Sequence, residues 1–351
     1  MSVLSKIMAN KTIKANVFVD RPKEYINTGS LVLNILYSGK LDGGIIKGKV
    51  MQIVAPSTLG KSILAMKIAR SAQKQGMDVL LVDTEFAYDP IFANKVGIEP
   101  DKFGVIQTNS MEEIQQSLIS AIQELTQDEK DNLLIVLDSW GNMVTSKTIN
   151  DAVEGKDVSD MTISKKKNAL ARMLSGLKTT VFIVNQTYSS MDKYEPLVVG
   201  GGAGLYFVCS SIVMGTSKAK DKDADGEITG AIISATSKKG RFCKENTKLK
   251  YLIEHNGGIH PYYGILEDAL EGAYVMKPKV GWYTRPSVKD DKSWREAQIW
   301  NNAEEFWQPI LNNTDLKKYI SDKYTYNGEI HDSNFDGKLQ EDDIFDKEDV
   351  E

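Results

Sequence analysis

The chain has 351 residues, enough for about two domains of ordinary size or for one large domain with an appendage. Hydrophobic residues make up 41% and charged residues 26%, values that are typical of globular proteins and exclude wholesale disorder. No apolar stretch reaches the ~18 residues of a membrane-spanning helix, and residues 1–21 lack an apolar core of signal-peptide length. Two cysteines, Cys209 and Cys243, exclude a disulfide framework, and no Cys/His cluster has zinc spacing. We therefore expect a soluble, cytoplasmic protein.

The net charge of −5 is unevenly distributed. Residues 341–351 contain seven carboxylates and one lysine, a sum of −6, so residues 1–340 sum to +1. A nearly neutral body gives no compositional support for nucleic-acid binding, which must then depend on local patches. We expect residues 327–351 to form an acidic, disordered tail; the alternative is a regulatory tail that repels DNA or recruits a basic partner.

The first 25 residues are polar and mixed in character. They predict a short helix at Ser2–Asn10 and a strand at Asn16–Asp20. Because the strand-like Val17-Phe18-Val19 lies outside any obvious core, we expect residues 1–25 to form an N-terminal oligomerisation segment. The apolar segment at residues 30–37 predicts a buried helix, which stops at a cluster of glycines.

From residue 49 onward, short apolar runs alternate with amphipathic helical patterns. The predicted strands fall at residues 49–55, 79–83, 133–137, 181–184 and 211–214. Helical spacing is found at residues 63–75 and 111–125. This alternation is typical of a mostly parallel sheet flanked by helices, an α/β fold. Residues 228–236 and 249–254 alternate in polarity and predict an antiparallel extension of that sheet.

The composition changes near residue 266. Four of the five tryptophans lie downstream of that point, in a segment that is more polar and more helical in pattern. We therefore expect a core at residues 26–265 and a small C-terminal α/β domain at residues 266–326, followed by the acidic tail.

One segment fits a phosphate-binding loop. It consists of Ala55, Pro56, Ser57, Thr58, Leu59, Gly60, Lys61 and Ser62, between a predicted strand and a predicted helix. Backbone N–H groups of such a loop surround the phosphates of a nucleotide. Lys61 is expected to contact the β- and γ-phosphates of ATP, and Ser62 to bind Mg²⁺. The alternative is an ordinary helix-capping turn.

Two acids follow predicted strands and complete a candidate ATPase site. Asp138 directly follows the apolar run at residues 133–137, the pattern of a second carboxylate near the metal. Glu85 follows the run at residues 79–83, so we expect it at the carboxyl edge of the sheet, where it could activate the attacking water. The alternatives are a loop-capping aspartate and a solvated glutamate.

The order of motifs resembles that of RecA-type recombinases over roughly residues 24–325. The motifs are Thr28-Gly29-Ser30, the phosphate loop, Asp83-Thr84-Glu85, Asp89-Pro90-Ile91-Phe92, Asp138-Ser139, Asn185-Gln186, Gly257-Gly258-Ile259 and Gly281-Trp282-Tyr283. The runs Val158-Ser159-Asp160-Met161-Thr162 and Gly200-Gly201-Gly202 are similar to those of the UvsX-type recombinases of tailed bacteriophages. Ala55 departs from the family, which has glycine there.

The resemblance implies a RecA-like P-loop ATPase core with further site residues. Asp89 and Phe92 would hold the adenine, and Gln186 would sense the γ-phosphate. Lys239 and Arg241 would act on the ATP of a neighbouring subunit, with Lys238 leaving the register uncertain by one residue. Without the family, Gln186 is a surface amide and residues 238–241 are a basic hairpin turn.

The candidate DNA contacts are weaker as sequence signals. The segment at residues 187–203 has two acids against one lysine, so contact there would depend on backbone N–H groups and aromatic stacking. A lysine triple supplies the better basic patch, although it also fits a solvated helix face. The candidates are Tyr188, Tyr194, Gly200, Gly201, Gly202, Lys165, Lys166 and Lys167.

Two acidic segments are similar to calcium-binding loops. The segment at residues 221–232 ends in Ile232 where the last ligand belongs, so we expect a hairpin loop. The segment at residues 332–343 has oxygen ligands at positions one, three, five and twelve, but Asp343 is shorter than the usual glutamate. We expect no calcium to be used there.

Taken with the resemblance, these observations predict an ATP- and Mg²⁺-dependent DNA recombinase. It would form a helical filament on single-stranded DNA, pair that strand with a homologous duplex, and hydrolyse ATP to ADP and phosphate. A single-strand-binding or loader protein is a possible partner, and a phage-encoded protein would act in the host cytoplasm. The alternatives are a RecA-like regulatory ATP-binding module and a hexameric DNA helicase motor.

Overall fold

The computed structural model describes residues 23–156, 160, 162–189, 197–200, 202–222 and 225–326. The expected N-terminal helix and strand, the acidic tail and the calcium-like segment at residues 332–343 lie outside these residues. Among the described helices, none is long and apolar enough to cross a membrane.

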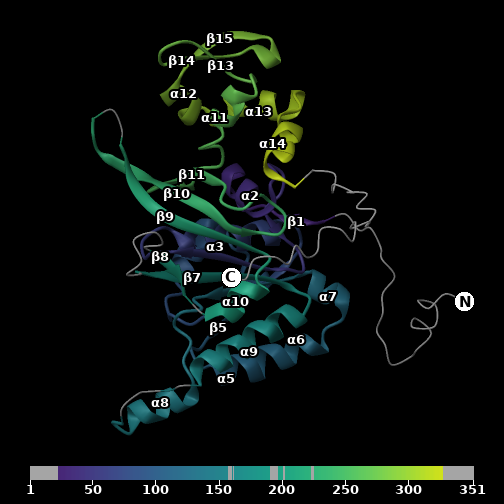
Figure 1. Cartoon of the computed structure of the whole chain (residues 1–351), viewed down its shortest axis with the longest axis vertical. Helices are drawn as coiled ribbons and strands as arrows, with labels where there is room; N and C mark the ends of the chain where they lie inside the picture. The colour runs from purple at the N-terminus through teal and green to yellow at the C-terminus, as the bar shows by residue number, and fades with distance from the viewer. Residues whose placement is uncertain are drawn as a thin grey trace, which may run out of the picture.

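A mixed, mostly parallel sheet forms the centre of the described structure (Figure 1). Its strands, in spatial order, are β12 (Gly258–Ile259), β11 (Lys248–Glu254), β10 (Ile228–Gly240), β9 (Ser211–Lys222), β3 (Val50–Ala55), β7 (Thr180–Ser189), β6 (Leu133–Asp138), β4 (Asp78–Asp83) and β5 (Phe103–Gln107). The strands from β9 to β5 pair in parallel, and β10, β11 and β12 extend the sheet in antiparallel pairs. The strand β8 (Leu197–Val199) pairs with the end of β7.

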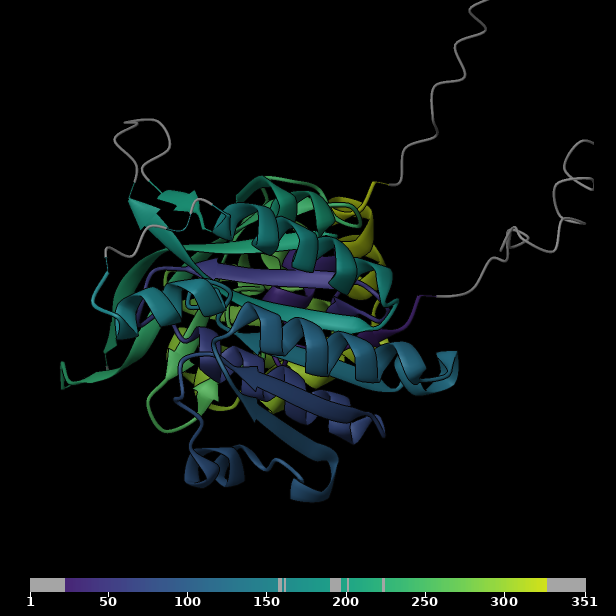
Figure 2. The same cartoon turned by 90° about the horizontal axis from the view of Figure 1, so that it is seen from below.

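Successive residues of a strand point to opposite faces of the sheet. Since the strands are apolar on both faces, helices cover both of them. In β3, Met51 and Ile53 join a core with the helices α2 (Leu31–Ser38) and α3 (Lys61–Lys74). Val50 and Val54 join a second core on the other face. The helices over that face, which lie in front of the strands in Figure 2, are α5 (Met111–Glu113), the π-helical η2 (Ile114–Ile119), α6 (Ser120–Glu124), α9 (Ile163–Gly176) and α10 (Gly202–Val208).

The helix α2 shows how local sequence sets these boundaries. The Ser30 hydroxyl accepts a hydrogen bond from the Leu33 N–H at its start. Gly39 ends it with φ 73°, a left-handed conformation that glycine adopts without strain.

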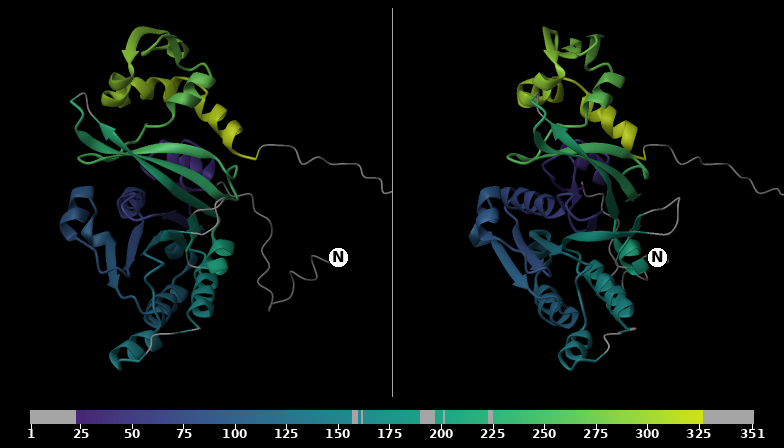
Figure 3. Two further views of the ribbon diagram at one scale, coloured as in Figure 1. Left: turned by 60° about the vertical axis from the view of Figure 1, so that its left-hand side comes forward. Right: turned by 90° about the vertical axis from the view of Figure 1, so that its left-hand side faces the viewer.

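The C-terminal part lies beyond β10 and β11 and carries a sheet of its own (Figure 3). Three antiparallel strands form it: β13 (Met276–Lys279), β14 (Trp282–Arg285) and β15 (Asp290–Arg295). The helices around it are α11 (Leu266–Glu271), α12 (Glu296–Asn301), α13 (Ala303–Asn313) and α14 (Leu316–Tyr324). Buried Trp294, Phe306 and Trp307 continue the core that begins on α2 and α3.

The remaining elements are short. They are β1 (Tyr25–Ile26), β2 (Ile45–Ile46), α4 (Pro90–Val96), η1 (Pro100–Lys102), α7 (Gln127–Asp131), α8 (Ser146–Val153) and η3 (Pro286–Val288). The strands β1 and β2 pair with each other, and α8 projects from the body with none of its side chains buried (Figure 1).

The predicted α/β fold is confirmed. The strands β5, β8 and β12 of the central sheet were not predicted, and β7, β9 and β10 extend beyond the predicted runs. The helical segment at residues 111–125 is present but contains a π-helical stretch. In the C-terminal part, the α/β character is confirmed, whereas the helical pattern alone did not indicate the three-stranded sheet.

Burial of both thiols makes cysteine reactivity a test of the core. Burial raises the pKa of Cys209 to about 12 and also raises the pKa of Cys243. We therefore expect neither thiol of the native protein to react with Ellman's reagent at pH 8, and both to react in guanidinium chloride. Rapid reaction of the native protein would contradict this packing.

Candidate functional site

The phosphate loop and the two predicted acids meet at one edge of the sheet. The strands β3, β7, β6 and β4 are parallel neighbours, so their carboxyl ends lie side by side. Ala55 pairs with Gln186 at the ends of β3 and β7, and Asp83 pairs with Asp138 at the ends of β4 and β6. The sheet therefore gathers at one edge side chains that are far apart in sequence.

The loop between β3 and α3 turns sharply, as a phosphate-binding loop would. Thr58 and Gly60 have φ values of 67° and 71°, which turn the backbone sharply before the helix. The φ of Gly60 lies in the left-handed region, which favours glycine, and a Cβ atom there would also displace Cδ1 of Ile253, which it would approach to 2.2 Å. Lys61 Nζ donates to the Pro56 carbonyl at 2.9 Å, which holds the ammonium group over the loop. Burial lowers the pKa of Lys61, while Asp138 and Glu85 oppose that shift.

Ser62 and Asp138 form the candidate metal position. The Ser62 hydroxyl donates to Oδ2 of Asp138 at 2.7 Å. Burial raises the pKa of Asp138 to about 6; the Ser62 hydrogen bond opposes the shift, and Glu85 adds to it. Within the described residues, no group of three or more His, Cys, Asp or Glu side chains could hold a metal. Two oxygen ligands suit Mg²⁺, which usually takes its other ligands from water and nucleotide phosphates.

Glu85 lines the same pockets as Ser62 and Asp138 and is held by hydrogen bonds from its neighbours. Its Oε1 atom accepts hydrogen bonds from the Ser139 hydroxyl at 2.7 Å and from Nε2 of Gln186 at 3.4 Å. The buried Asp83 carboxylate shapes the turn that carries Glu85, because it accepts from the backbone N–H groups of Glu85 and Tyr88. Gln107 Nε2 also donates to Asp83, at 3.1 Å.

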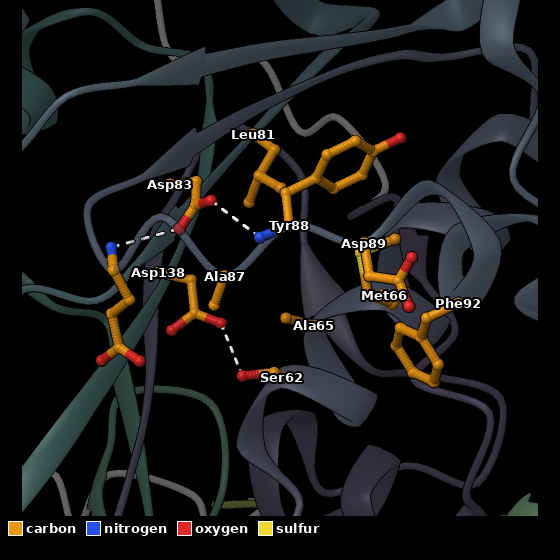
Figure 4. Close-up of a pocket in the computed structure, with 11 residues that line it drawn as sticks. Ser62, Ala65, Met66, Leu81, Asp83, Ala87, Tyr88, Asp89, Phe92 and Asp138 are labelled. Atoms are coloured by element: carbon orange, nitrogen blue, oxygen red, sulfur yellow. Dashed lines mark hydrogen bonds between the residues drawn. The ribbon is translucent and has the colours of Figure 1, made fainter.

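Two adjoining pockets share Ser62, Glu85 and Asp138. The first contains the loop and Gln186, and the second is more apolar and contains Met66, Asp89 and Phe92. Figure 4 shows Asp89 and Phe92 at one end of the second pocket and Ser62 with Asp138 at the other. Asp89 caps α4 by accepting from the Ile91 N–H at 2.8 Å, which fixes its carboxylate at the pocket wall. This arrangement has a polar end for phosphates and an apolar end for a ring.

The structure does not bring Lys239 and Arg241 to this site. Lys239 pairs with Ile212, which pairs with Gln52 near the start of β3, away from the loop that follows Ala55. Its Nζ donates to the carbonyls of Tyr206 and Phe207 at 2.7 and 3.1 Å. Arg241 Nη2 also donates to the Phe207 carbonyl, at 3.3 Å. Both cations therefore lie at the carboxyl end of α10.

The three candidate DNA-binding lysines have different surroundings. Lys165 is exposed on α9. Lys166 forms an ion pair with Glu112 at 2.7 Å. Lys167 is half-buried and donates to the carbonyls of Trp140 and Gly141, and its burial lowers its pKa.

The segment after Gln186 begins with the antiparallel pairing of β7 and β8. Only some of its candidate DNA-binding residues belong to the described part of the chain. Gly200 returns to the strand end, since its N–H donates to the Gln186 carbonyl at 3.1 Å and its carbonyl accepts from Asn185 Nδ2 at 2.7 Å. Tyr188 is 54% exposed, and Gly202 begins α10. Tyr194 and Gly201 lie outside the described residues.

Two residues of the site were not predicted as such. Ser139 contacts Glu85, and Asn185 ties Gly200 to the strand end. Each directly adjoins a predicted site residue, in the motifs Asp138-Ser139 and Asn185-Gln186, and this adjacency was the signal that could have identified them.

Comparison with known proteins agrees with these motifs. A family model of the RecA N-terminal domain matches residues 9–259, and one of the bacteriophage T4 recombination and repair protein, C-terminal domain, matches residues 262–320. The chain is 29% identical over 335 residues to the recombination and repair protein of Enterobacteria phage T4, covering 91% of this chain and 83% of that protein. It is 28% identical over 264 residues to the protein RecA of Rhodopirellula baltica, covering 74% of this chain and 67% of that protein.

The raised pKa of Asp138 predicts a pH-dependent stability. Because its folded-state pKa lies above the ordinary 3.8, the folded protein binds this proton more tightly and loses stability as the pH rises from about 4 to about 6. In a buffer with a metal chelator at pH 7.5, Asp138→Asn should raise the free energy of unfolding by roughly 2–3 kcal/mol. The gain should nearly vanish at pH 4. Urea unfolding at both pH values measures it, and equal stability at pH 7.5 would contradict the burial of this charge.

Proposed function

The chain belongs to the RecA family of recombination and repair proteins, and we propose that it is a DNA-dependent ATPase that forms filaments on single-stranded DNA. In such a filament it would pair the bound strand with a homologous duplex and exchange strands. Hydrolysis of ATP to ADP and phosphate would release the DNA.

The observation that carries this proposal is the convergence of Lys61, Ser62, Asp138 and Glu85 at one sheet edge. Backbone N–H groups of residues 56–62 and the Lys61 ammonium would bind the phosphates of ATP. Ser62 and Asp138 would hold Mg²⁺, which neutralises phosphate charge when bound. Phe92 and Asp89 would contact the adenine at the apolar end of the pocket.

Glu85 is the candidate base for the attacking water. Its carboxylate is exposed at the edge where the phosphate loop ends, and one of its oxygens is already fixed by Ser139. It would orient the water and accept its proton. Gln186, which lies beside Glu85, would respond to the γ-phosphate.

The position of Gln186 also suggests how nucleotide binding and DNA binding would be coupled. It lies at the base of the hairpin formed by β7 and β8, and Gly200 is bonded to its carbonyl. A change at Gln186 would therefore move both ends of the segment at residues 187–202. We propose that DNA contacts this segment, through Tyr188, Tyr194 and the glycines Gly200, Gly201 and Gly202, and the exposed Lys165 on α9.

The position of Lys239 and Arg241 suggests a role in an assembly. Both lie away from the phosphate loop of their own chain, and both are held by carbonyls of α10. In a helical filament they would reach the ATP of a neighbouring subunit and neutralise charge on the transferred phosphoryl group. Residues 1–25 would dock one subunit on the next, residues 26–265 would form the ATPase and DNA-binding core, and residues 266–326 the small C-terminal domain.

ATP hydrolysis with and without single-stranded DNA tests the proposal. We expect DNA to raise the rate strongly in the wild type, and Lys61→Ala to reduce it at least about a hundredfold because the phosphates lose their cation. Lys165→Ala, which leaves the ATP site intact, should weaken DNA binding more than hydrolysis at saturating DNA. A rate that is indifferent to DNA would overturn the filament mechanism.

Strand exchange separates the recombinase from a helicase motor and a regulatory module. With homologous single-stranded and duplex DNA, we expect ATP-dependent joint molecules that resist removal of protein. Unwinding of a duplex without a homologous partner would favour the helicase, and ATP binding without either reaction would favour the regulatory module.

A further inference from the structure

The ends of β4 and β6 are joined by a side chain as well as by the backbone. Asp83 pairs with Asp138 at the last position of the ladder, and the Thr84 N–H donates to the Asp138 carbonyl at 2.8 Å. One step further, the Thr84 hydroxyl accepts from the Ser139 N–H at 2.8 Å and donates to the Ser139 carbonyl at 2.7 Å. A single hydroxyl thus satisfies both backbone groups of Ser139.

The two hydrogen bonds between the Thr84 hydroxyl and the Ser139 backbone form a clamp, and both of its residues are buried. Thr84 is 2% exposed and Ser139 is not exposed at all. Buried backbone groups beyond the end of a strand need a hydrogen-bond partner, and the Thr84 hydroxyl supplies one for each. The backbone of Ser139 therefore has a fixed place relative to β4.

Ser139 stands between the two carboxylates of the site. It directly follows Asp138, which accepts from Ser62, and its own hydroxyl donates to Oε1 of Glu85 at 2.7 Å. Glu85 itself directly follows Thr84. Asp138, Ser139, Thr84 and Glu85 are thus linked in a closed ring by two peptide bonds and four hydrogen bonds, which connects the candidate metal ligand to the candidate base.

We propose that Thr84 and Ser139 are positioning residues for ATP hydrolysis. Thr84 fixes the Ser139 backbone, and Ser139 fixes the Glu85 carboxylate through Oε1, so that Oε2 is left to face the attacking water. The second donor to Oε1, Gln186, lies 3.4 Å away and holds it less closely than Ser139 does. This inference rests on the proposed ATPase activity and assigns no contact with substrate to either residue.

The decisive variant is Thr84→Val, which keeps the shape of the side chain and removes the hydroxyl. We expect kcat to fall about ten- to hundredfold, as when the supporting contact of a catalytic group is lost, with KM for ATP changed by less than about twofold. Thr84→Ser restores the hydroxyl and should recover most of the loss. Ser139→Ala, which keeps the clamped backbone, should lower kcat in the same way.

Thr179→Val is the matched control. Thr179 is also buried, and its hydroxyl donates to the carbonyls of Lys130 and Leu133 at the opposite end of β6, at 2.8 and 3.1 Å. We expect it to lower the melting temperature about as much as Thr84→Val does, without changing kcat. This separates positioning from a general loss of stability.

A double variant gives a further readout that stability alone does not affect. If Thr84 acts through the Ser139 hydroxyl, Thr84→Val should cost little more kcat in the Ser139→Ala background, so the two losses should not add. Normal kcat in both Thr84→Val and Ser139→Ala would overturn the inference while leaving the ATPase proposal intact. A wild-type protein without ATP hydrolysis would overturn the proposed function itself, and this role with it.

Discussion

The site depends on the parallel alignment of β3, β7, β6 and β4. Because neighbouring parallel strands end at the same edge, residues from four segments that are distant in the chain meet there. Two apolar cores hold the alignment, one on each face, and a shift of one residue in any strand would exchange the faces. The register that buries Val54, Val136 and Ile183 therefore also sets the places of Lys61, Asp138 and Gln186.

Burial at that edge leaves the charges of the site incompletely balanced. It raises the pKa of Asp138 and lowers the pKa of Lys61, so each group is disfavoured in its charged form. A metal ion and a phosphate chain would relieve both penalties together, since one supplies positive and the other negative charge. The same burial makes hydrogen bonds such as that between Ser139 and Glu85 effective in fixing geometry.

Much of this could be predicted from sequence, because the signals are local. The phosphate loop, the strand before it and the helix after it form one continuous pattern, and Asp138 follows an uninterrupted apolar run. The strand β5 was missed because Phe103–Gln107 contains a glycine and only partly buried or exposed residues. The segment forms a strand because it pairs with β4 at the edge of the sheet, and its own apolar pattern is too weak to indicate this.

What could not be predicted involves partners that are distant in the chain. Lys166 reads as a free basic residue, yet its carboxylate partner Glu112 lies 54 positions away. Lys167 likewise donates hydrogen bonds to two carbonyls of the turn after β6, which lies more than 25 positions earlier in the chain. The clamp between Thr84 and Ser139 spans 55 positions and depends on the register of two strands. The fold places Lys239 and Arg241 at the end of α10, and the role proposed for them would require a second copy of the chain.

We propose that this edge supplies one half of the ATP site and that a neighbouring copy supplies the cations. A mixture of two inactive variants distinguishes this arrangement from one confined to a single subunit: Glu85→Gln, and the double substitution Lys239→Ala with Arg241→Ala. Each alone should have almost no DNA-dependent ATPase activity. An equimolar mixture should recover about a quarter of the wild-type rate, since random assembly makes that share of interfaces complete. A mixture that co-assembles on DNA and stays inactive would show that the cations do not act on the ATP of a neighbouring subunit, and full activity of the double variant alone would show that they take no part in hydrolysis.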